Sequence, residues 1–107
     1  MKQTSICAVA LLCALLSASA TQAQEAQIER GRAFAQNNCA PCHAVGRTGD
    51  SPLPNAPPFR ALHLRYPVEQ LAESLAEGIK TSHPMPEFQL DNTQIADVIA
   101  YLKSLER

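Results

Sequence analysis

The sequence has no tryptophan, only two lysines after the first two residues, and no run of like charges. Three Phe and two Tyr are its only aromatic residues, so aromatic side chains supply little of any core. A formal net charge of −1 without a clustered basic segment argues against a nucleic-acid-binding protein. It also argues against electrostatic binding to a membrane surface. Alternating polar and apolar residues, the pattern of a half-buried strand, do not occur over any useful length. The sequence therefore predicts an all-α fold, and 107 residues allow one domain at most.

The N-terminus has the three parts of a secretory signal. Lys2 gives a basic start, residues 6–16 (ICAVALLCALL) are uniformly apolar, and small residues follow. An apolar core of 11 residues is shorter than the roughly 17–25 residues that span a bilayer. We therefore predict a signal peptide at residues 1–23 and a periplasmic domain at residues 24–107. Cleavage after Ala20 and a retained anchor are the alternatives.

Removal of the signal leaves a domain that is poor in covalent and apolar stabilisation. Residues 24–107 keep eight of nine basic residues and all ten acidic ones, for a formal charge of −2. They keep two of four cysteines, Cys39 and Cys42, which are too close in sequence to staple distant segments. A domain this small buries too little surface to be more than marginally stable alone. We therefore expect a bound group to complete the core.

Three helices are expected in this domain. The first spans about Ala26–Asn37 and ends at two asparagines. The second opens at Tyr66-Pro67, because proline suits the first helical position. Its apolar stripe is spaced three and four residues apart and comprises Val68, Leu71, Leu75 and Ile79.

The last helix has the clearest start. Asp91 and Gln94 form a capping-box pattern, and Leu90 with Ile95 matches a hydrophobic staple. Its predicted buried face consists of Ile95, Val98, Ile99, Leu102 and Leu105. Residues 46–58, rich in Gly and Pro, are predicted to be a loop that either wraps another part of the molecule or a bound group, or is loose.

Residues 39–43 (CAPCH) carry the strongest chemical signal. C-x-x-C-H is the pattern for covalent attachment of a c-type haem. Two thiols on one helical turn each add to a vinyl group of the porphyrin, and His43 then faces the iron. A thioredoxin-like redox pair requires a βαβ context, which is missing. A zinc site needs about four ligands and leaves the long loop unexplained. A short disulfide explains still less.

The chain resembles small single-haem class I cytochromes c over nearly all of residues 24–107. The resemblance is carried by GRAFAQNNCAPCHAVG, APPFRAL, HPMPEF and DVIAYLKSL. It implies an all-α fold around one covalent haem c, whose iron has a histidine and a methionine as axial ligands. It also implies that the first and last helices cross, with Gly31 and Phe34 meeting Tyr101 and Leu102.

Met85 is the predicted sixth ligand on independent grounds. It is the only methionine left after signal removal and lies 42 residues beyond His43, between two prolines. A core methionine is the structural alternative, and His63 and His83 are rival ligands. A histidine–methionine pair raises the reduction potential and leaves no open site for a substrate.

Further haem contacts are predicted from the resemblance and from side-chain chemistry. The resemblance implies that a proline carbonyl, best aligned at Pro57, accepts the N–H of His43 and fixes its ring, with Pro58 as the alternative. Guanidinium groups suit haem propionates, and aromatic side chains suit the haem wall. The residues concerned are Arg60, Arg65, Tyr66 and Phe59.

The predicted function is therefore one-electron transfer between periplasmic redox proteins, a donor dehydrogenase and an acceptor oxidase or reductase, without enzymatic activity of its own. The protein is expected to be a monomer or a subunit, not inserted in the membrane. One alternative is a dedicated haem subunit of a dehydrogenase complex. Another is a haem enzyme or gas sensor with an open iron site. The scarcity of lysine argues against docking through a basic ring.

Overall fold

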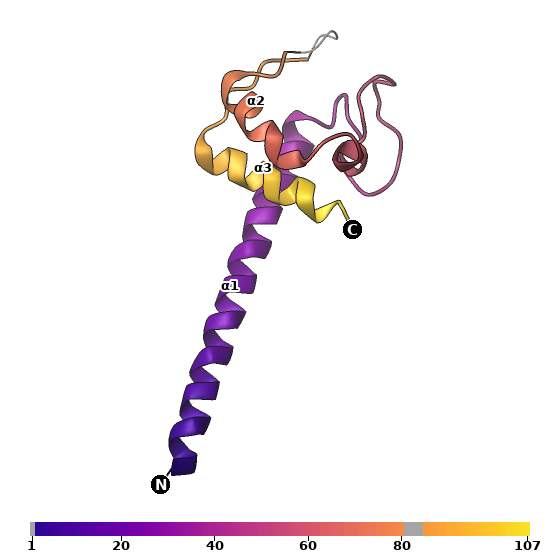
Figure 1. Cartoon of the computed structure of the whole chain (residues 1–107). Coiled ribbons are helices and arrows are strands. Elements are labelled where there is room, and N and C mark those ends of the chain that lie inside the picture. The colour runs from indigo at the N-terminus through magenta and orange to yellow at the C-terminus, as the bar shows by residue number, and fades with distance from the viewer. Residues whose placement is uncertain (1, 81–84) are drawn as a thin grey trace.

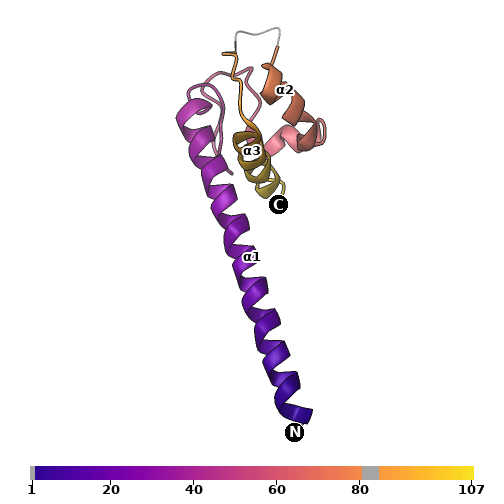
Figure 2. The same cartoon turned by 90° about the vertical axis from the view of Figure 1, so that its left-hand side faces the viewer.

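The structure, a computed structural model, describes residues 2–80 and 85–107, and of residues 2–5 the backbone alone. Its elements are the helices α1 (Lys2–Asn38), α2 (Leu71–Glu77) and α3 (Asn92–Ser104) and the 3₁₀ helices η1 (Phe59–Leu64) and η2 (Val68–Gln70). No strand occurs among the described residues, which agrees with the predicted all-α class. Figures 1 and 2 show that α2, α3, the 3₁₀ helices and the end of α1 form one globular part. The rest of α1 projects from it as a long stem.

Helix α1 ends close to where the sequence predicts but begins much earlier. Its last residue is Asn38, whose side-chain amide donates to the carbonyl oxygen of Phe34 at 2.9 Å. The predicted start near Ala26 is wrong, because the helix runs without a break from Lys2. Residues 21–27 contain neither Gly nor Pro and are mostly Gln, Ala and Glu, which favour helix.

The stem, residues 6–26, is exposed along its whole length. Its large apolar side chains are 61–70% exposed and comprise Ile6, Val9, Leu11, Leu12, Leu15 and Leu16. The segment Ile6–Asn38 is long and apolar enough to cross a membrane, a property that N-terminal signal sequences share. The division into a signal at residues 1–23 and a domain at residues 24–107 stays a prediction.

Helices α1 and α3 cross at Gly31. A Cβ atom built on Gly31 would lie 1.9 Å from the backbone oxygen of Asp97 and 2.8 Å from the Cβ of Tyr101. Only glycine therefore allows the two backbones to approach this closely. Beside the crossing, the guanidinium of Arg30 donates two hydrogen bonds of 2.9 Å to the carboxylate of Asp97, which is 7% exposed. The predicted meeting of Gly31 with Tyr101 is present, and Phe34 packs half-buried against the same core.

The start of α3 is as predicted. The side chain of Asp91 accepts a hydrogen bond from the backbone of Gln94 at 2.8 Å, and the side chain of Gln94 accepts from the backbone of Asp91 at 3.1 Å. Leu90 and Ile95 are both buried in the core, as a hydrophobic staple requires. The predicted face is buried except for Ile99, which is half-buried, and it also includes Asp97 and Tyr101.

The middle of the chain departs from the prediction. Pro67 precedes the short η2, and α2 then ends at Glu77 instead of reaching Ile79. Gly78 ends the helix with a φ of +99°, a conformation that glycine adopts without strain. Ile79 is half-buried against the core but is not helical. Helix η1 was not predicted, since two turns of 3₁₀ helix leave no 3.6-residue pattern to detect.

Candidate functional site

The attachment segment continues the last turn of α1. The backbone N–H groups of Cys39 and Ala40 both donate to the carbonyl oxygen of Ala35, at 2.8 and 3.1 Å. Those of Cys42 and His43 donate to the carbonyl oxygen of Cys39, at 3.2 and 2.9 Å. The two cysteines and the histidine are therefore held on one hydrogen-bonded turn, as their spacing predicts.

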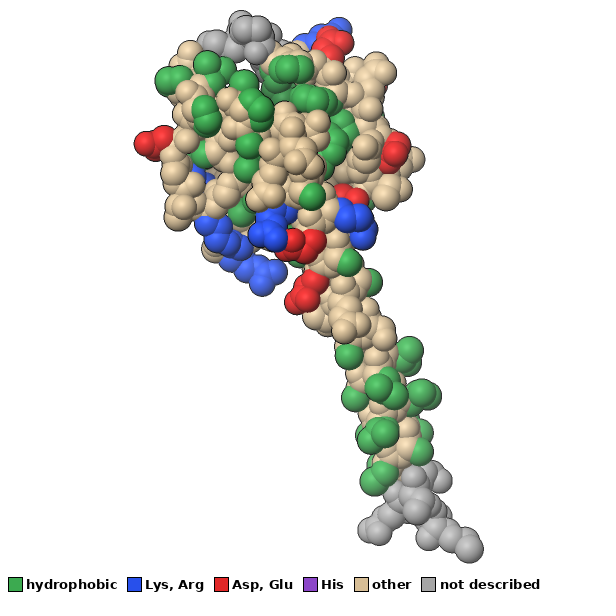
Figure 3. Space-filling model, turned by 180° about the vertical axis from the view of Figure 1, so that it is seen from behind, with side chains coloured by type: hydrophobic (Ala, Val, Ile, Leu, Met, Phe, Trp, Pro, Cys, Tyr) green, Lys and Arg blue, Asp and Glu red, His purple; other side chains and the backbone are tan. Residues whose placement is uncertain are grey.

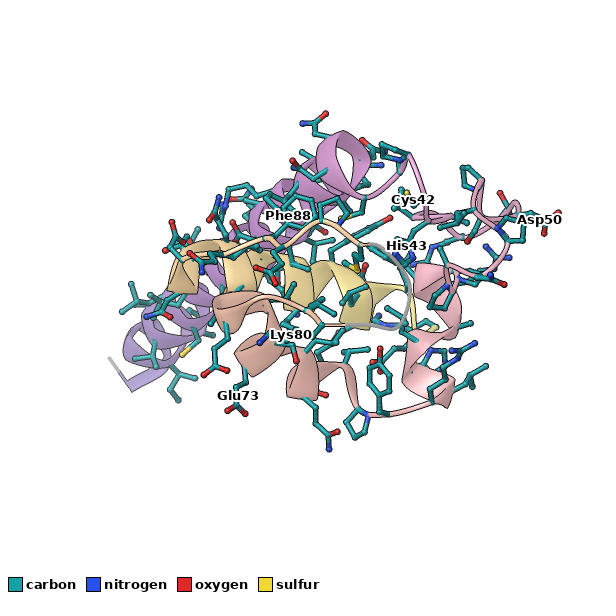
Figure 4. The ribbon with its side chains drawn as sticks, turned by 90° about the horizontal axis from the view of Figure 1, so that it is seen from above. Cys42, His43, Asp50, Glu73, Lys80 and Phe88 are labelled. Carbon is teal, nitrogen blue, oxygen red and sulfur yellow. The ribbon has the colours of Figure 1, made fainter. Side chains whose placement is uncertain are left out.

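This turn forms one wall of a cavity of about 340 Å³ in the upper part of the molecule. The described lining residues are Asn38, Cys39, Pro41, Cys42, His43, Leu53, Asn55, Ala56, Pro57, Arg65, Met85, Pro86 and Phe88. Figure 4 shows Cys42 and His43 on one side and Phe88 on the segment that leads into α3. The fold thus brings residues 39–43 and Met85, far apart in sequence, to the same space.

A hydrogen bond and an aromatic contact fix the orientation of the His43 ring. Its Nδ1 lies 2.8 Å from the carbonyl oxygen of Pro57, so the ring donates Nδ1–H to this carbonyl and keeps Nε2 free as a ligand. The ring of Phe59 lies against it, with a centroid distance of 5.1 Å and an interplanar angle of 49°. Of the two prolines considered from sequence, Pro57 makes this contact.

The loop of residues 46–58 is tied to the attachment turn at several points. The N–H of Leu53 donates to the carbonyl of Cys42 at 3.0 Å, and the N–H of Phe59 donates to that of Ala44 at 2.9 Å. The N–H of Ala44 donates to the Ser51 hydroxyl at 3.0 Å. The hydroxyl of Tyr101 on α3 donates to the carbonyl of Val45. The loop therefore wraps the attachment turn, which is one of the two predicted possibilities.

Met85, Pro86 and Phe88 form the wall that comes from the segment before α3. Phe88 is held edge-on against Phe34 of α1, with ring centroids 6.3 Å apart. The N–H of Leu90 donates to the carbonyl of Leu75 at 3.0 Å and so attaches this segment to α2. The rival ligand His83 lies outside the described residues.

Three predicted haem contacts do not line the cavity. Arg65 lines it, whereas Arg60, Tyr66 and Phe59 are absent from its described lining. Phe59 is buried in the core and contacts the ring of His43. Tyr66 packs half-buried against the core, which was its structural alternative. Arg60 and His63 each bury one side-chain nitrogen that has no hydrogen-bond partner among the described residues. Of the lining residues, Leu53, Asn55 and Phe88 were not predicted, because nothing in the sequence indicates which loop positions turn inward.

The thiol of Cys39 has a strongly altered acidity. Burial raises the pKa of this thiol to about 11, and the neighbouring Cys42 adds to the shift. The thiol is therefore protonated and neutral at physiological pH. The thioether sulfur that would form on haem attachment is neutral as well.

The alternatives to haem find no support in the geometry. Among the described residues, no group of three or more His, Cys, Asp and Glu side chains is placed to hold a metal ion, as a zinc site requires. The same part of the chain has no βαβ unit for a thioredoxin-like pair. The cavity instead combines two thiols, an oriented imidazole, a thioether sulfur and mostly apolar walls, and this donor set fits a covalently attached haem.

Comparisons with known proteins agree with this site. The family model described as Cytochrome c matches residues 28–106. The protein named cytochrome c-553-like from Synechocystis sp. is 31% identical over 77 residues, which cover 72% of this chain and 68% of that protein. Cytochrome c-552 from Bradyrhizobium diazoefficiens is 32% identical over 91 residues, 84% of this chain and 86% of the relative. No solved structure matches the chain. The chain therefore belongs to the cytochrome c family and is an electron-transfer protein with a covalently bound c-type haem.

Proposed function

We propose that this protein is a periplasmic carrier that moves one electron at a time between two redox proteins. The observation that carries the proposal is the convergence of Cys39, Cys42, His43 and Met85 on one cavity. The haem supplies an iron that alternates between its ferrous and ferric states. The protein supplies the attachment, the two ligands and a mostly apolar enclosure.

Each residue of the site has a distinct role in this proposal. Cys39 and Cys42 form the two thioether bonds, since both line the cavity from the same turn. His43 would ligate the iron through Nε2, with its ring held by its hydrogen bond to Pro57. That bond also increases the electron density on the ring and so its strength as a ligand. Met85, which lines the same cavity, would supply the second protein ligand to the iron.

Ligation of the iron by both His43 and Met85 would let the protein carry electrons without catalysing a reaction. Thioether ligation would favour the ferrous state and raise the reduction potential. With both ligands supplied by the protein, no site on the iron would remain for a substrate. The protein needs only to meet a donor and then an acceptor.

Visible spectroscopy of the exported protein tests the axial pair. We expect the weak far-red absorption band of methionine–iron ligation in the oxidised wild type and its loss in Met85→Ala. Met85→His should lack the band as well but remain six-coordinate, which separates loss of the sulfur from loss of the fold. A band that survives both substitutions would overturn the assignment of Met85.

Export forms the second part of the proposal. The basic start, the apolar stretch and the small residues before Ala23 support removal of residues 1–23 by a signal peptidase. N-terminal sequencing of the haem-containing protein should therefore give Gln24 as the first residue, or Thr21 if cleavage follows Ala20. Recovery of haem protein that still begins at Met1 would show instead that the stem is kept.

A further inference from the structure

Arg47 is bonded differently from the other cationic side chains that contact α1 or α3. The Lys and Arg side chains in view in Figure 3 gather where the globular part meets the stem. Three cationic side chains pair with carboxylates, in the pairs Arg30–Asp97, Arg32–Glu29 and Lys103–Glu69. Arg47 instead donates to the backbone oxygens of Ser104 and Arg107, at 2.6 and 2.9 Å. It therefore ties the beginning of the loop of residues 46–58 to the end of α3.

The end of α3 is a favourable place for this guanidinium. Ser104 is the last residue of α3, so its carbonyl oxygen has no N–H partner within the helix. A positive charge is also favoured there, because the helix dipole is negative at the C-terminal end. Two residues before Arg47, the carbonyl of Val45 accepts a hydrogen bond from the hydroxyl of Tyr101, which also belongs to α3. Two side-chain contacts therefore hold residues 45–47 on α3.

Beyond Arg47, hydrogen bonds rather than packing set the course of the loop. Residues 47–50 and 52–55 are exposed, and Figure 4 shows Asp50 at the outer edge of the molecule, away from His43. The backbone of Ala44 holds the rest of the loop: its N–H donates to the hydroxyl of Ser51 at 3.0 Å, and its carbonyl accepts from the N–H of Phe59 at 2.9 Å. The position of residue 57, two residues before Phe59, therefore depends on where residues 44 and 45 lie.

We propose that Arg47 is a positioning residue for His43. By holding residues 45–47 on α3, it keeps the loop in place and with it the carbonyl oxygen of Pro57, 2.8 Å from Nδ1 of His43. The inference rests on the function proposed above, in which Nε2 of His43 ligates the haem iron. A carbonyl that accepts Nδ1–H makes the imidazole a stronger electron donor, which favours ferric over ferrous iron. A loosened loop should therefore weaken this hydrogen bond and favour the ferrous state.

Arg47→Gln tests the proposal in the exported holoprotein through the hydrogen bond itself. The exchange of the His43 Nδ1–H with solvent is followed by NMR of the ferrous protein, prepared with isotope-labelled histidine. We expect this exchange to be about tenfold faster in Arg47→Gln than in the wild type, because the loss of two hydrogen bonds makes local opening of the loop more frequent. Thermal unfolding of each variant is measured alongside, so that local opening can be separated from a loss of overall stability.

Arg30→Gln is the matched control. It removes the same charge and also breaks two hydrogen bonds to α3, those to the carboxylate of Asp97, but it does not touch the loop. Because the buried carboxylate then lacks its partner, this variant should lose at least as much Tm as Arg47→Gln. The exchange of the His43 Nδ1–H should nevertheless stay close to that of the wild type.

The midpoint potential gives a second measurement. Loss of a positive charge lowers the potential in both arginine variants, so Arg47→Gln is compared with Arg30→Gln. At a fixed applied potential, the ratio of ferrous to ferric protein should be about threefold higher in Arg47→Gln, which corresponds to about 28 mV for one electron. Tyr101→Phe removes the other contact of the loop with α3 without changing the charge. Its potential should therefore rise above that of the wild type.

Two results would overturn the proposal. If Arg47→Gln and Arg30→Gln accelerate the exchange in proportion to their losses of Tm, Arg47 contributes only to overall stability. If the exchange and the potential of Arg47→Gln equal those of Arg30→Gln, the loop does not act on His43. In both cases the wild type still has His43 bound to the iron. Failure of the proposed function would instead appear as a wild type without haem, or as His43 ring protons that lack the large upfield shift of an iron-bound imidazole.

Discussion

Glycine at position 31 sets how closely α1 and α3 can pack, and Gly31→Ala tests this directly. The added Cβ would lie 1.9 Å from the backbone oxygen of Asp97, whereas carbon and oxygen normally approach to about 3.3 Å. The helices must then separate by about 1.4 Å, since the obstacle is backbone and cannot rotate away. This movement would also disturb the core around the crossing, including Tyr101, which is 5% exposed.

The expected cost follows from two opposing effects. Overpacking of a core costs about 1–3 kcal/mol or more, whereas alanine favours helix over glycine by about 1 kcal/mol. With backbone as the obstacle the overpacking cost lies at the upper end of that range, so we expect a net loss of about 2 kcal/mol, or a fall in Tm of about 8–16 °C for a domain of this size. Thermal unfolding of the holoprotein, followed by far-UV circular dichroism, measures it.

Gly46→Ala is the matched control for this experiment. Nothing lies within 4 Å of a Cβ built on Gly46, and its φ is not positive. This substitution should leave the Tm unchanged or slightly raised, because it only reduces the freedom of the unfolded chain. A Gly31→Ala protein as stable as Gly46→Ala would refute the close approach of the two helices.

Three further predictions concern the loop, the haem and salt. Tyr101→Phe removes the hydrogen bond to Val45 and should destabilise the holoprotein by about 1 kcal/mol in urea denaturation. Burial raises the pKa of Tyr101 above 10, so the folded state holds this proton more tightly than the unfolded state. The free energy of unfolding of the wild type should therefore decrease as the pH rises above 10. In Tyr101→Phe this decrease should be smaller, because the titrating hydroxyl is gone. The same pH profile in both proteins would contradict the raised pKa of Tyr101. The double variant Cys39→Ala, Cys42→Ala should be largely unfolded without haem, and a cooperative helical apoprotein would speak against a core completed by haem. Electron transfer to the natural partner should slow only modestly between low and physiological salt, because Arg65 is the one cationic side chain among the described lining residues of the cavity; a hundredfold fall would contradict this reasoning.

The features that the sequence predicts correctly in this protein depend on residues that are close together in the sequence. The capping box of α3 needs only Asp91 and Gln94, so it can be identified before the fold is known. The turn at residues 39–43 is equally local, and the two thiols and the imidazole reach the cavity together because they share that turn. The close approach at Gly31 was expected from family resemblance, since no pattern in α1 alone identifies the partner helix.

The predictions that were wrong concern features that depend on tertiary structure. From the sequence alone, Arg60 and Arg65 are equally good candidates for a place at the cavity. Only Arg65 lines it, whereas Arg60 lies within η1, which was not predicted. The directions of these two side chains depend on that 3₁₀ helix. The early end of α2 was missed because Ile79 continued the apolar stripe, whereas the positive φ of Gly78 terminated the helix. The helical structure of the stem, residues 6–26, was not predicted, because the signal peptide was expected to be separate from the first helix of the domain.

The crossing of α1 with α3 also has a consequence for the order of events in biogenesis. Gly31 and Asp97 are 66 residues apart, so this contact can form only when almost the whole chain is available for folding. Until then α3 cannot hold Val45 through Tyr101. Contacts between distant segments also form late because closing a long loop costs entropy. The contacts of α3 with Gly31 and Val45 are therefore expected to be among the last to form when the chain folds.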